Sequence, residues 1–539
     1  MSNKMKHTKG SVTTMEKKAE VNVMNPQSVS ADQYTLIIEN TDNVEAPKPG
    51  KGLFESRKNR IEASLGSNND LVSIVMQSFN RLDKTKNCVE SILKYTNDIN
   101  YELILIDNGS TDGTLDYFKS IKHPQKTIVH VTKNIGSYVP SIYKLKGKYV
   151  ANVCNDTYVT KNWLTNLLTC MKSDETIGIA VPVISNGSNN QGADISFNSL
   201  DEMQAKAALH NVSNPCLWQE RIRLVIQLAL YKREIFDLVG LADYGFFHDF
   251  ADDDISFRIR RAGYKLMLCR DTFVHHDHIR QNMSSEEVAA FDRSIESGRE
   301  DFQNKYYGVD AWSDVNNYEP ALITLLNPKE YSPKESVEVL GVDVYCGTPI
   351  LEVKNKLKEN AVFSTNLSAF STHAKYWLDL KSICTKNVVV DRIGNINSCF
   401  NDEKFDIIIL GKPINSFENS LGLLENLLKL VKTNGHLLVN LRNSFDFTSL
   451  IKSLGGNVTM NEQFEDRQLI FQMSIDDFLI KIDKLGYRHN RIIPENWPVD
   501  QNLLPIISKA ISAINLNTNP QEIYNRSIIR NFSIDIVKK

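Results

Sequence analysis

Three consecutive aspartates, Asp252, Asp253 and Asp254, are candidates for acid–base chemistry. A carboxylate with an ordinary pKa of about 3.9 is ionised at neutral pH and can accept a proton from an attacking hydroxyl group. Acidic residues also favour the first turn of a helix, which could account for one or two of the three. The triplet is therefore a candidate for a catalytic base or for the start of a helix.

Polar loops after two predicted strands form a second group of candidates. Residues 78–81 follow the buried run that starts at Leu71, and Asp107 ends the next buried run. In open parallel sheets, ligands bind beyond the carboxyl ends of the strands. A carboxylate there can accept hydrogen bonds from a nucleobase or a ribose hydroxyl, and Gly109 and Gly113 permit a tight turn. The alternative interpretation is a simple helix-capping turn.

These loops need a sheet to hold them, and the hydrophobic pattern predicts one. Buried runs at 71–76, 101–106 and 127–131 alternate with predicted helices at 83–95 and 114–120. This alternation is typical of a mostly parallel α/β sheet.

A second α/β pattern begins near residue 335. It contains buried runs at 337–342 and 405–410 and a leucine-rich helix at 421–431, and Asn434-Gly435 predicts a left-handed end to that helix. The chain is thus divided into a mostly disordered tail and linker (1–69), a first α/β domain (70–312), a linker (313–334), a second α/β domain (335–495) and a C-terminal extension (496–539).

The composition narrows the classes of function and location. The 539 residues include 62 Lys and Arg and 65 Asp and Glu, so the net charge is −3. A chain with this charge balance has no global electrostatic reason to bind nucleic acid. The eight cysteines are scattered, as is typical of reduced thiols. We find no signal peptide, and the apolar run 224–231 is far shorter than the roughly 20 residues that span a bilayer. We therefore expect a cytoplasmic protein without a transmembrane segment; its oligomeric state does not follow from the sequence.

The order of motifs over residues 70–280 resembles that of family 2 glycosyltransferases. The matching elements are Phe79-Asn80, Cys88-Val89-Glu90-Ser91-Ile92, Asp107-Asn108-Gly109-Ser110-Thr111-Asp112-Gly113-Thr114, Asn134-Ile135-Gly136, Lys146-Gly147-Lys148-Tyr149, Asn155-Asp156 and Trp163-Leu164. The resemblance implies a GT-A fold and an inverting transfer from a nucleotide sugar. It also implies a donor site made of Ser78, Phe79, Asn80, Arg81, Asp107, Gly109, Asn134, Gly136, Asn155 and Asp156.

The resemblance further implies a metal ion and a base. Asp156 would meet a divalent ion, Mn²⁺ or Mg²⁺, that neutralises the leaving diphosphate. His276 or His275 would be a further ligand, which suits Mn²⁺ better than Mg²⁺. By position Asp252 is the catalytic base. Asp254 would support the site or contact the acceptor, and Asp253 is the alternative base.

Two positions depart from the family pattern. Cys154 stands where an acidic residue or Asn is usual, so Asp156 alone supplies charge in the metal motif, and a metal-independent enzyme is an alternative. Ala251 replaces the family's Glu at the start of the acidic segment. Both departures support the alternative of a catalytically silent scaffold that binds a nucleotide sugar.

Residues 335–495 resemble class I S-adenosylmethionine-dependent methyltransferases, first in the run 339–351 and again in the segments 404–440 and 471–487. Tyr345 and Pro349 occupy two of the family's glycine positions. A Tyr side chain would crowd the cofactor, and Pro removes an amide donor. We therefore expect a degenerate methyltransferase-like domain that does not bind S-adenosylmethionine and serves acceptor recognition, dimerisation or stability.

The leading hypothesis is an inverting hexosyltransferase of bacterial type. It would move a sugar from a nucleotide donor, expected to be a UDP-sugar, to a hydroxyl of a surface glycan or of a protein such as flagellin. Besides the silent scaffold, the alternative is a bifunctional glycosyltransferase and methyltransferase.

Overall fold

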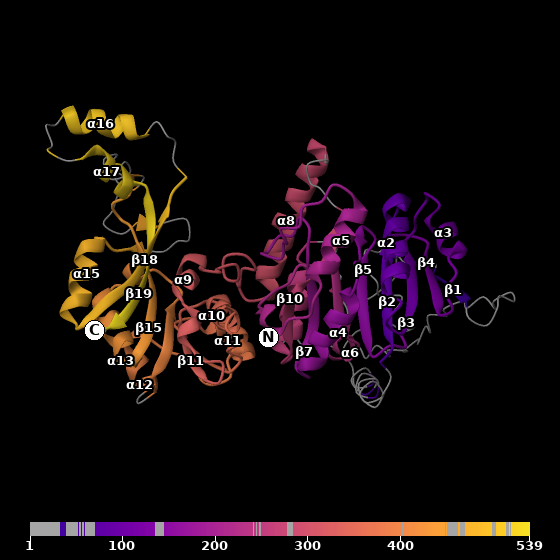
Figure 1. Ribbon diagram of the computed structural model, residues 1–539, viewed down its shortest axis with the longest axis horizontal. Helices are drawn as coiled ribbons and strands as arrows, with labels where there is room; N and C mark the ends of the chain where they lie inside the picture. The colour runs from indigo at the N-terminus through magenta and orange to yellow at the C-terminus, as the bar shows by residue number, and fades with distance from the viewer. Residues whose placement is uncertain are drawn as a thin grey trace, which may run out of the picture.

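The computed structural model describes residues 33–38, 70–134, 145–277, 284–447 and 469–539, and the isolated positions 52, 55, 59, 449 and 462–463. Short gaps inside these ranges fall at 241, 244, 247–248, 401–402, 448, 499–502, 514–516 and 518. Two α/β sheets with their covering helices lie side by side along the long axis of the molecule (Figure 1).

The first sheet has ten strands, mostly parallel around its centre. Its spatial order is β1 (Gln33–Ile38), β4 (Lys126–Val131), β3 (Tyr101–Asp107), β2 (Val72–Ser78), β5 (Tyr149–Cys154), β9 (Leu228–Lys232), β7 (Ile177–Ile184), β10 (Lys265–His276) and β6 (Thr157–Tyr158), with β8 (Trp218–Arg221) also paired to β10. β1, β4, β3, β2 and β5 are parallel to one another, so their carboxyl ends meet at one edge.

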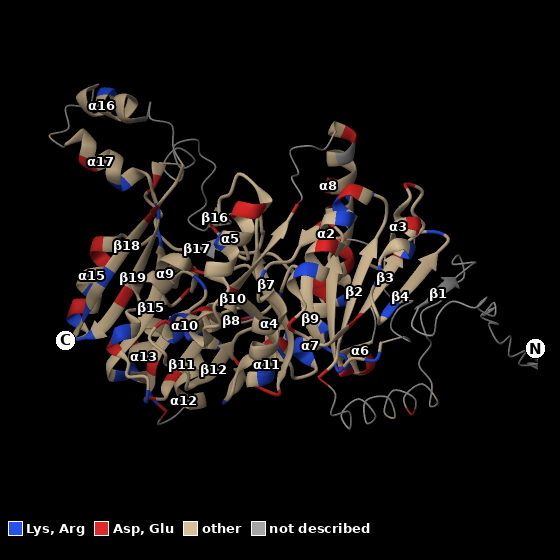
Figure 2. Ribbon diagram, turned by 45° about the vertical axis from the view of Figure 1, so that its right-hand side comes forward, with Lys and Arg blue, Asp and Glu red and all other residues tan. Residues whose placement is uncertain are grey.

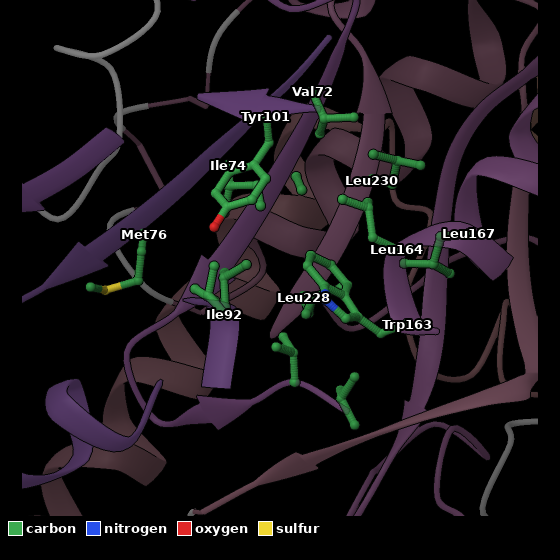
Figure 3. Close-up of a cluster of buried hydrophobic side chains, with 14 of the residues drawn as sticks. Val72, Ile74, Met76, Ile92, Tyr101, Trp163, Leu164, Leu167, Leu228 and Leu230 are labelled. Atoms are coloured by element: carbon green, nitrogen blue, oxygen red, sulfur yellow. The ribbon is translucent and has the colours of Figure 1, made fainter. Parts of the chain in front are cut away.

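Helices cover this sheet because each buries one apolar face. They are α2 (Leu82–Tyr95), α3 (Thr114–Ser120), α4 (Trp163–Ser173), α5 (Leu200–His210), α6 (Glu234–Val239) and α7 (Ala251–Arg261). The next helix, α8 (Ser285–Lys305), contributes Phe302 to a core that both halves share. On α2, Cys88, Val89 and Ile92 are fully buried at helical spacing. Trp163, at the start of α4, packs beside Leu164 and Leu228 in the same core (Figure 3).

The second sheet has seven strands. Its order is β13 (Val388–Val390), β12 (Thr365–Ser371), β11 (Val337–Val342), β14 (Phe405–Leu410), β15 (Val431–Arg442), β19 (Ile529–Lys538) and β18 (Tyr487–Asn496). β19 is antiparallel to both of its neighbours, and the other pairs are parallel.

The helices of the second half are α9 (Pro320–Leu325), α10 (Thr348–Lys358), α11 (Trp377–Ile383), α12 (Ile396–Phe400), α13 (Ser420–Leu430), α15 (Ile475–Lys484), α16 (Leu503–Ala513) and α17 (Pro520–Ser527). Two short strands, β16 (Glu462–Gln463) and β17 (Leu469–Ile470), form a separate pair.

The predicted α/β class is confirmed for both halves, and most buried runs are strands at the expected places. The expected left-handed end of the leucine-rich helix is wrong. α13 ends at Leu430, Val431 is already extended, and Asn434-Gly435 lies inside β15. Gly435 is needed for a different reason: a Cβ there would lie 2.8 Å from the carbonyl oxygen of Asp406 on the neighbouring strand.

The two halves share an apolar core. One buried cluster contains Phe257 and Phe302 from the first half together with Val339 and Leu380 from the second. The segment 313–334, expected as a linker, includes α9, and the segment 496–539, expected as an extension, supplies β19 to the second sheet. Among the helices in the described part of the chain, none has the length and apolar character to cross a bilayer.

Candidate active site

The loops after β2 and β3 form one wall of the candidate site. Ser78 and Asp107 are register partners at the carboxyl ends of these strands. Asn80 and Arg81 both adopt left-handed backbone, with φ of 56° and 59°, which turns the chain into α2. The two loops are tied together, because the Asn80 amide donates to Ser110 Oγ (2.9 Å) and Asn80 Oδ1 accepts from the Thr111 amide (3.0 Å).

Asp107 lies beneath this wall and is fully buried. Its Oδ1 accepts from the Ser110 amide (3.0 Å), and its Oδ2 lies 2.7 Å from His130 Nδ1. The sequence analysis missed His130. The signal was available, because His130 lies at the end of the next predicted strand and the parallel register places it beside Asp107.

The remaining donor-site candidates lie around the same edge. Asn108 Nδ2 donates to Asn134 Oδ1 (2.8 Å). Gly109 has φ of +83°, and a Cβ at this position would lie 3.2 Å from the Asn134 amide nitrogen, so both the turn and the close approach require glycine. Phe79 is 45% exposed, which leaves an aromatic ring at the surface of the loop. Gly136 lies outside the described residues.

Asp156 lies in the turn between β5 and β6. Its Oδ1 is 3.6 Å from His276 Nε2, and its Oδ2 is 3.6 Å from Arg81 Nη1. The preceding Asn155 joins this turn to the first wall, since its Nδ2 donates to Ser78 Oγ (3.3 Å) and Thr85 Oγ1 (3.1 Å). The donor-loop and metal-motif candidates are therefore neighbours in space.

The two candidate histidines face different partners. His276 lies beside Asp156, whereas His275 Nδ1 is 2.6 Å from Ser185 Oγ and its ring packs edge-on against Phe197. Burial lowers the pKa of His275 below its ordinary value, which favours the neutral ring at pH 7.

Asp277 is a further acidic residue at this site that the sequence analysis did not select. Its amide donates to the Asp156 carbonyl (2.8 Å), and its Oδ2 accepts from Tyr158 Oη (2.7 Å). Lys84 also donates to the Asp277 carbonyl.

The three consecutive aspartates open α7 and have different environments. Asp253 is buried, with Oδ1 2.7 Å from Arg223 Nε, and burial raises its pKa. Asp254 is also buried; it accepts from Tyr306 Oη (2.7 Å) and forms ion pairs with Arg258 (2.8 Å) and Lys305 (2.5 Å). Asp252 alone of the three is partly exposed.

Asp252 faces the end of the central sheet. Its Oδ2 accepts from the Ile226 amide (2.9 Å), and the neighbouring Gln227 carbonyl accepts from the Cys154 amide (2.9 Å). Burial, with added repulsion from Asp156 and Asp252, raises the pKa of the Cys154 thiol. Cys154 is therefore a neutral thiol at neutral pH, placed between the metal-motif turn and the first turn of α7.

Few side chains near Asp156 could bind a metal ion. Within the described residues, there is no cluster of three or more His, Cys, Asp or Glu that could hold an ion. Asp156 and His276 offer one oxygen and one nitrogen, a set that suits Mn²⁺. An ion here would need its other ligands from a bound diphosphate or from water.

Comparison with known proteins finds a family match within the first half of the chain. Residues 73–237 match the family described as "Glycosyl transferase family 2". Over these residues the chain is similar to family 2 glycosyltransferases. The match includes the donor loops, Asn155 and Asp156, and ends before α7.

Two curated relatives align with parts of this chain. The poly(ribitol-phosphate) beta-glucosyltransferase of Bacillus spizizenii (strain ATCC 23059 / NRRL B-14472 / W23) is 29% identical over 117 residues, which are 20% of this chain and 18% of that protein. The putative teichuronic acid biosynthesis glycosyltransferase TuaG of Bacillus subtilis (strain 168) is 30% identical over 106 residues, 19% of this chain and 42% of that protein. The chain thus spans less than half the length of either relative.

Two solved structures show some similarity to this chain. The mannosyltransferase PcManGT from Pyrobaculum calidifontis, in complex with GDP-Man and Mn²⁺, covers 52% of this chain and 79% of its own, with 17% identity and a TM-score of 0.34. S. aureus TarS 1–349 covers 38% of this chain and 59% of its own, with 12% identity and a TM-score of 0.28. No functional conclusion follows from similarities of this size.

Proposed function

We propose that this protein is an inverting glycosyltransferase that moves a sugar from a UDP-sugar to a hydroxyl acceptor. One observation carries the proposal: in a chain with a family 2 glycosyltransferase domain, Asp252 is the partly exposed carboxylate of the acidic triplet and lies at the end of the central sheet. Asp253 and Asp254 are buried in ion pairs, which supports Asp252 over Asp253 as the base.

In the proposed reaction, Asp252 accepts the proton of the acceptor hydroxyl as that oxygen attacks the anomeric carbon. The amide of Ile226 holds one oxygen of Asp252 at 2.9 Å and so helps to fix the position of this carboxylate. The bond from the anomeric carbon to the diphosphate breaks on the opposite face, which inverts the configuration.

The residues around Asp156 receive the leaving group. Asp156 and His276 would hold a divalent cation, which supplies positive charge to the departing diphosphate when it is bound. The guanidinium of Arg81 is half exposed beside Asp156 and adds a second positive charge from the protein itself. Phe79 offers a face for the base, and Ser78, Asn80, Asp107, Gly109, Asn134 and Gly136 complete the proposed donor site.

For the acceptor, we propose a hydroxyl of a surface glycan. The support is that the names of both relatives are those of glycosyltransferases, one of a poly(ribitol-phosphate) and one of teichuronic acid biosynthesis. The alternative acceptor is a hydroxyl of a protein such as flagellin.

The proposal is tested by incubating the chain with Mn²⁺ and a panel of UDP-glucose, UDP-N-acetylglucosamine, GDP-mannose and dTDP-glucose. Release of the nucleoside diphosphate is measured with and without wall polymer extract or flagellin. We expect turnover of one UDP-sugar that the polymer stimulates, with inversion at the anomeric carbon seen by NMR. Turnover of GDP-mannose alone would overturn the choice of donor, and stimulation by flagellin alone would overturn the choice of acceptor. An absence of turnover with every donor would favour the silent scaffold.

We also propose that the second domain is methyltransferase-like but does not bind S-adenosylmethionine. The support lies in the turn after β11. Tyr345 has left-handed backbone (φ 53°), its ring packs edge-on against Tyr376, and Lys412 lies over it at 5.7 Å. The Asp343 carboxylate already accepts from the Thr372 amide (2.6 Å) and hydroxyl (2.9 Å).

A further inference from the structure

The segment 218–227 runs from the candidate base to the second domain. Near its end, the Ile226 amide donates to Asp252 Oδ2 and the Gln227 carbonyl accepts from the Cys154 amide, both at 2.9 Å. This segment therefore fixes one oxygen of the candidate base relative to the metal-motif strand.

At its other end, the same segment is held by α10 of the second domain. Lys354 Nζ lies 2.6 Å from Glu220 Oε2. Asn355 accepts from the Glu220 amide and donates to the Glu220 carbonyl, both at 3.1 Å, and Lys358 donates to the Trp218 carbonyl (2.8 Å). All four contacts are buried or mostly buried, and three of them join side chains of α10 to the main chain of β8.

The helix that carries Asp252 is held separately by α11. Asp379 Oδ1 accepts from Arg260 Nη2 (2.7 Å) and Arg261 Nε (2.9 Å), and Asp379 Oδ2 accepts from Arg261 Nη2 (2.9 Å). Ser382 adds a hydrogen bond from Arg260 Nη1 (2.7 Å). Burial alone would raise the pKa of Asp379, but the two guanidinium groups outweigh it and the pKa is lowered, so the carboxylate remains charged.

The segment 218–227 and α7 are also bonded to each other. Arg260 Nε donates to the Ile222 carbonyl (3.2 Å), the Leu224 amide donates to Ser256 Oγ (3.2 Å), and Arg223 pairs with Asp253. Figure 2 shows α10 beside β8 and α11 beside α7, and Figure 1 shows both helices on the side of the second domain that faces the first. The segment 218–227 and α7 thus form one unit around Asp252, anchored twice in the second domain.

We propose that the second domain serves as a positioning element for the catalytic base, with Lys354 and Asp379 as positioning residues that act through Asp252. This inference rests on the proposed function, in which Asp252 takes the proton. Its physical basis is that proton transfer and attack depend steeply on geometry, so a small displacement of a base slows the reaction even where substrate binding is intact. It gives the second domain a role that needs no cofactor.

The test uses the full chain and the donor that it turns over in the panel above, with Lys354→Met, Asp379→Asn and the control Lys386→Met. Lys386 pairs with Glu338 (2.8 Å) on an exposed part of the second domain. We expect Lys354→Met and Asp379→Asn to lower kcat about tenfold or more while the donor KM changes less than about twofold. The thermal stabilisation by UDP should persist, and Lys386→Met should match the unaltered chain.

A double variant separates positioning from general loss of stability. If Lys354 acts through Asp252, adding Lys354→Met to Asp252→Asn should not lower the residual rate further. A further tenfold loss in the double variant, or a folded Lys354→Met chain with unchanged kcat, would overturn the inference. Because Asp379→Asn leaves two buried guanidinium groups without their carboxylate, Lys354→Met decides the matter if Asp379→Asn does not fold. Absence of turnover in the unaltered chain would instead overturn the proposed function and this inference with it.

Discussion

The carboxylate of Asp156 lies 3.6 Å from Nε2 of His276, although the two residues are far apart in the sequence. The antiparallel pairing of β6 with the end of β10, in which Thr157 faces His276, brings them together. A spacing of this size allows both atoms to reach one cation, since metal–ligand bonds of this kind are about 2.0–2.2 Å long.

We predict that Asp156→Ala and His276→Ala each weaken Mn²⁺-dependent binding of UDP about tenfold or more, because each removes one of the two proposed protein ligands of the ion. Isothermal titration with UDP, with and without Mn²⁺, measures the effect. His489→Ala, at an exposed position in β18, is the control. If both variants keep the full metal dependence, the ion is held elsewhere or is not used.

We predict that Asp252→Asn lowers the rate of transfer, whereas Asp254→Asn lowers the stability of the fold. Asp252→Asn should lower kcat by about 10²-fold or more and leave the fold intact, because it removes the proposed base at a partly exposed position. Asp254→Asn should lower the free energy of unfolding by about 3 kcal/mol, because it leaves Arg258 and Lys305 without their buried partner. Donor turnover and urea denaturation measure the two effects. Normal turnover in Asp252→Asn would move the base to another residue.

We predict that S-adenosylhomocysteine does not raise the melting temperature of the chain. The Tyr345 ring packs against Tyr376 in the turn after β11, and Asp343 is already hydrogen-bonded to Thr372. A ligand at about 100 times its Kd would stabilise the chain by about 2.7 kcal/mol, which a thermal-shift measurement detects. A clear shift would show a functional cofactor site and revive the bifunctional alternative.

We predict that part of the stability of the second domain is lost as the pH rises. Burial alone would lower the pKa of His436, but Asp535 (3.0 Å) and Glu330 (3.1 Å) outweigh it and the pKa is raised. The protonated ring therefore stabilises the folded state fully below its ordinary pKa of about 6.5, and this contribution disappears as the pH rises through the higher folded value. Urea denaturation between pH 6 and pH 9 should show a smaller slope in His436→Gln than in the unaltered chain. An equal slope in both chains would assign the pH dependence to other groups.

The local pattern of the sequence was enough to place most strands and helices. The runs 337–342 and 405–410 are strands with those bounds, and the helix predicted at 114–120 is α3. These elements are determined by short-range periodicity and turn chemistry, which a single sequence displays directly. Asn434-Gly435 misled the analysis because the same dipeptide suits a helix end and a close strand pair, and only the neighbouring strand β14 decides between them.

Residue types and their spacing along the chain were enough to predict the α/β class, and they marked the candidate donor loops and the acidic triplet. Only the tertiary structure distinguished Asp252 from Asp253 and Asp254, since their burial is set by Arg223, Lys305 and Tyr306, which come from other segments. It also placed His130 beside Asp107 and Asp379 beside Arg260. Such pairings depend on how strands and helices pack across long distances in the chain, and one-dimensional spacing does not contain that information.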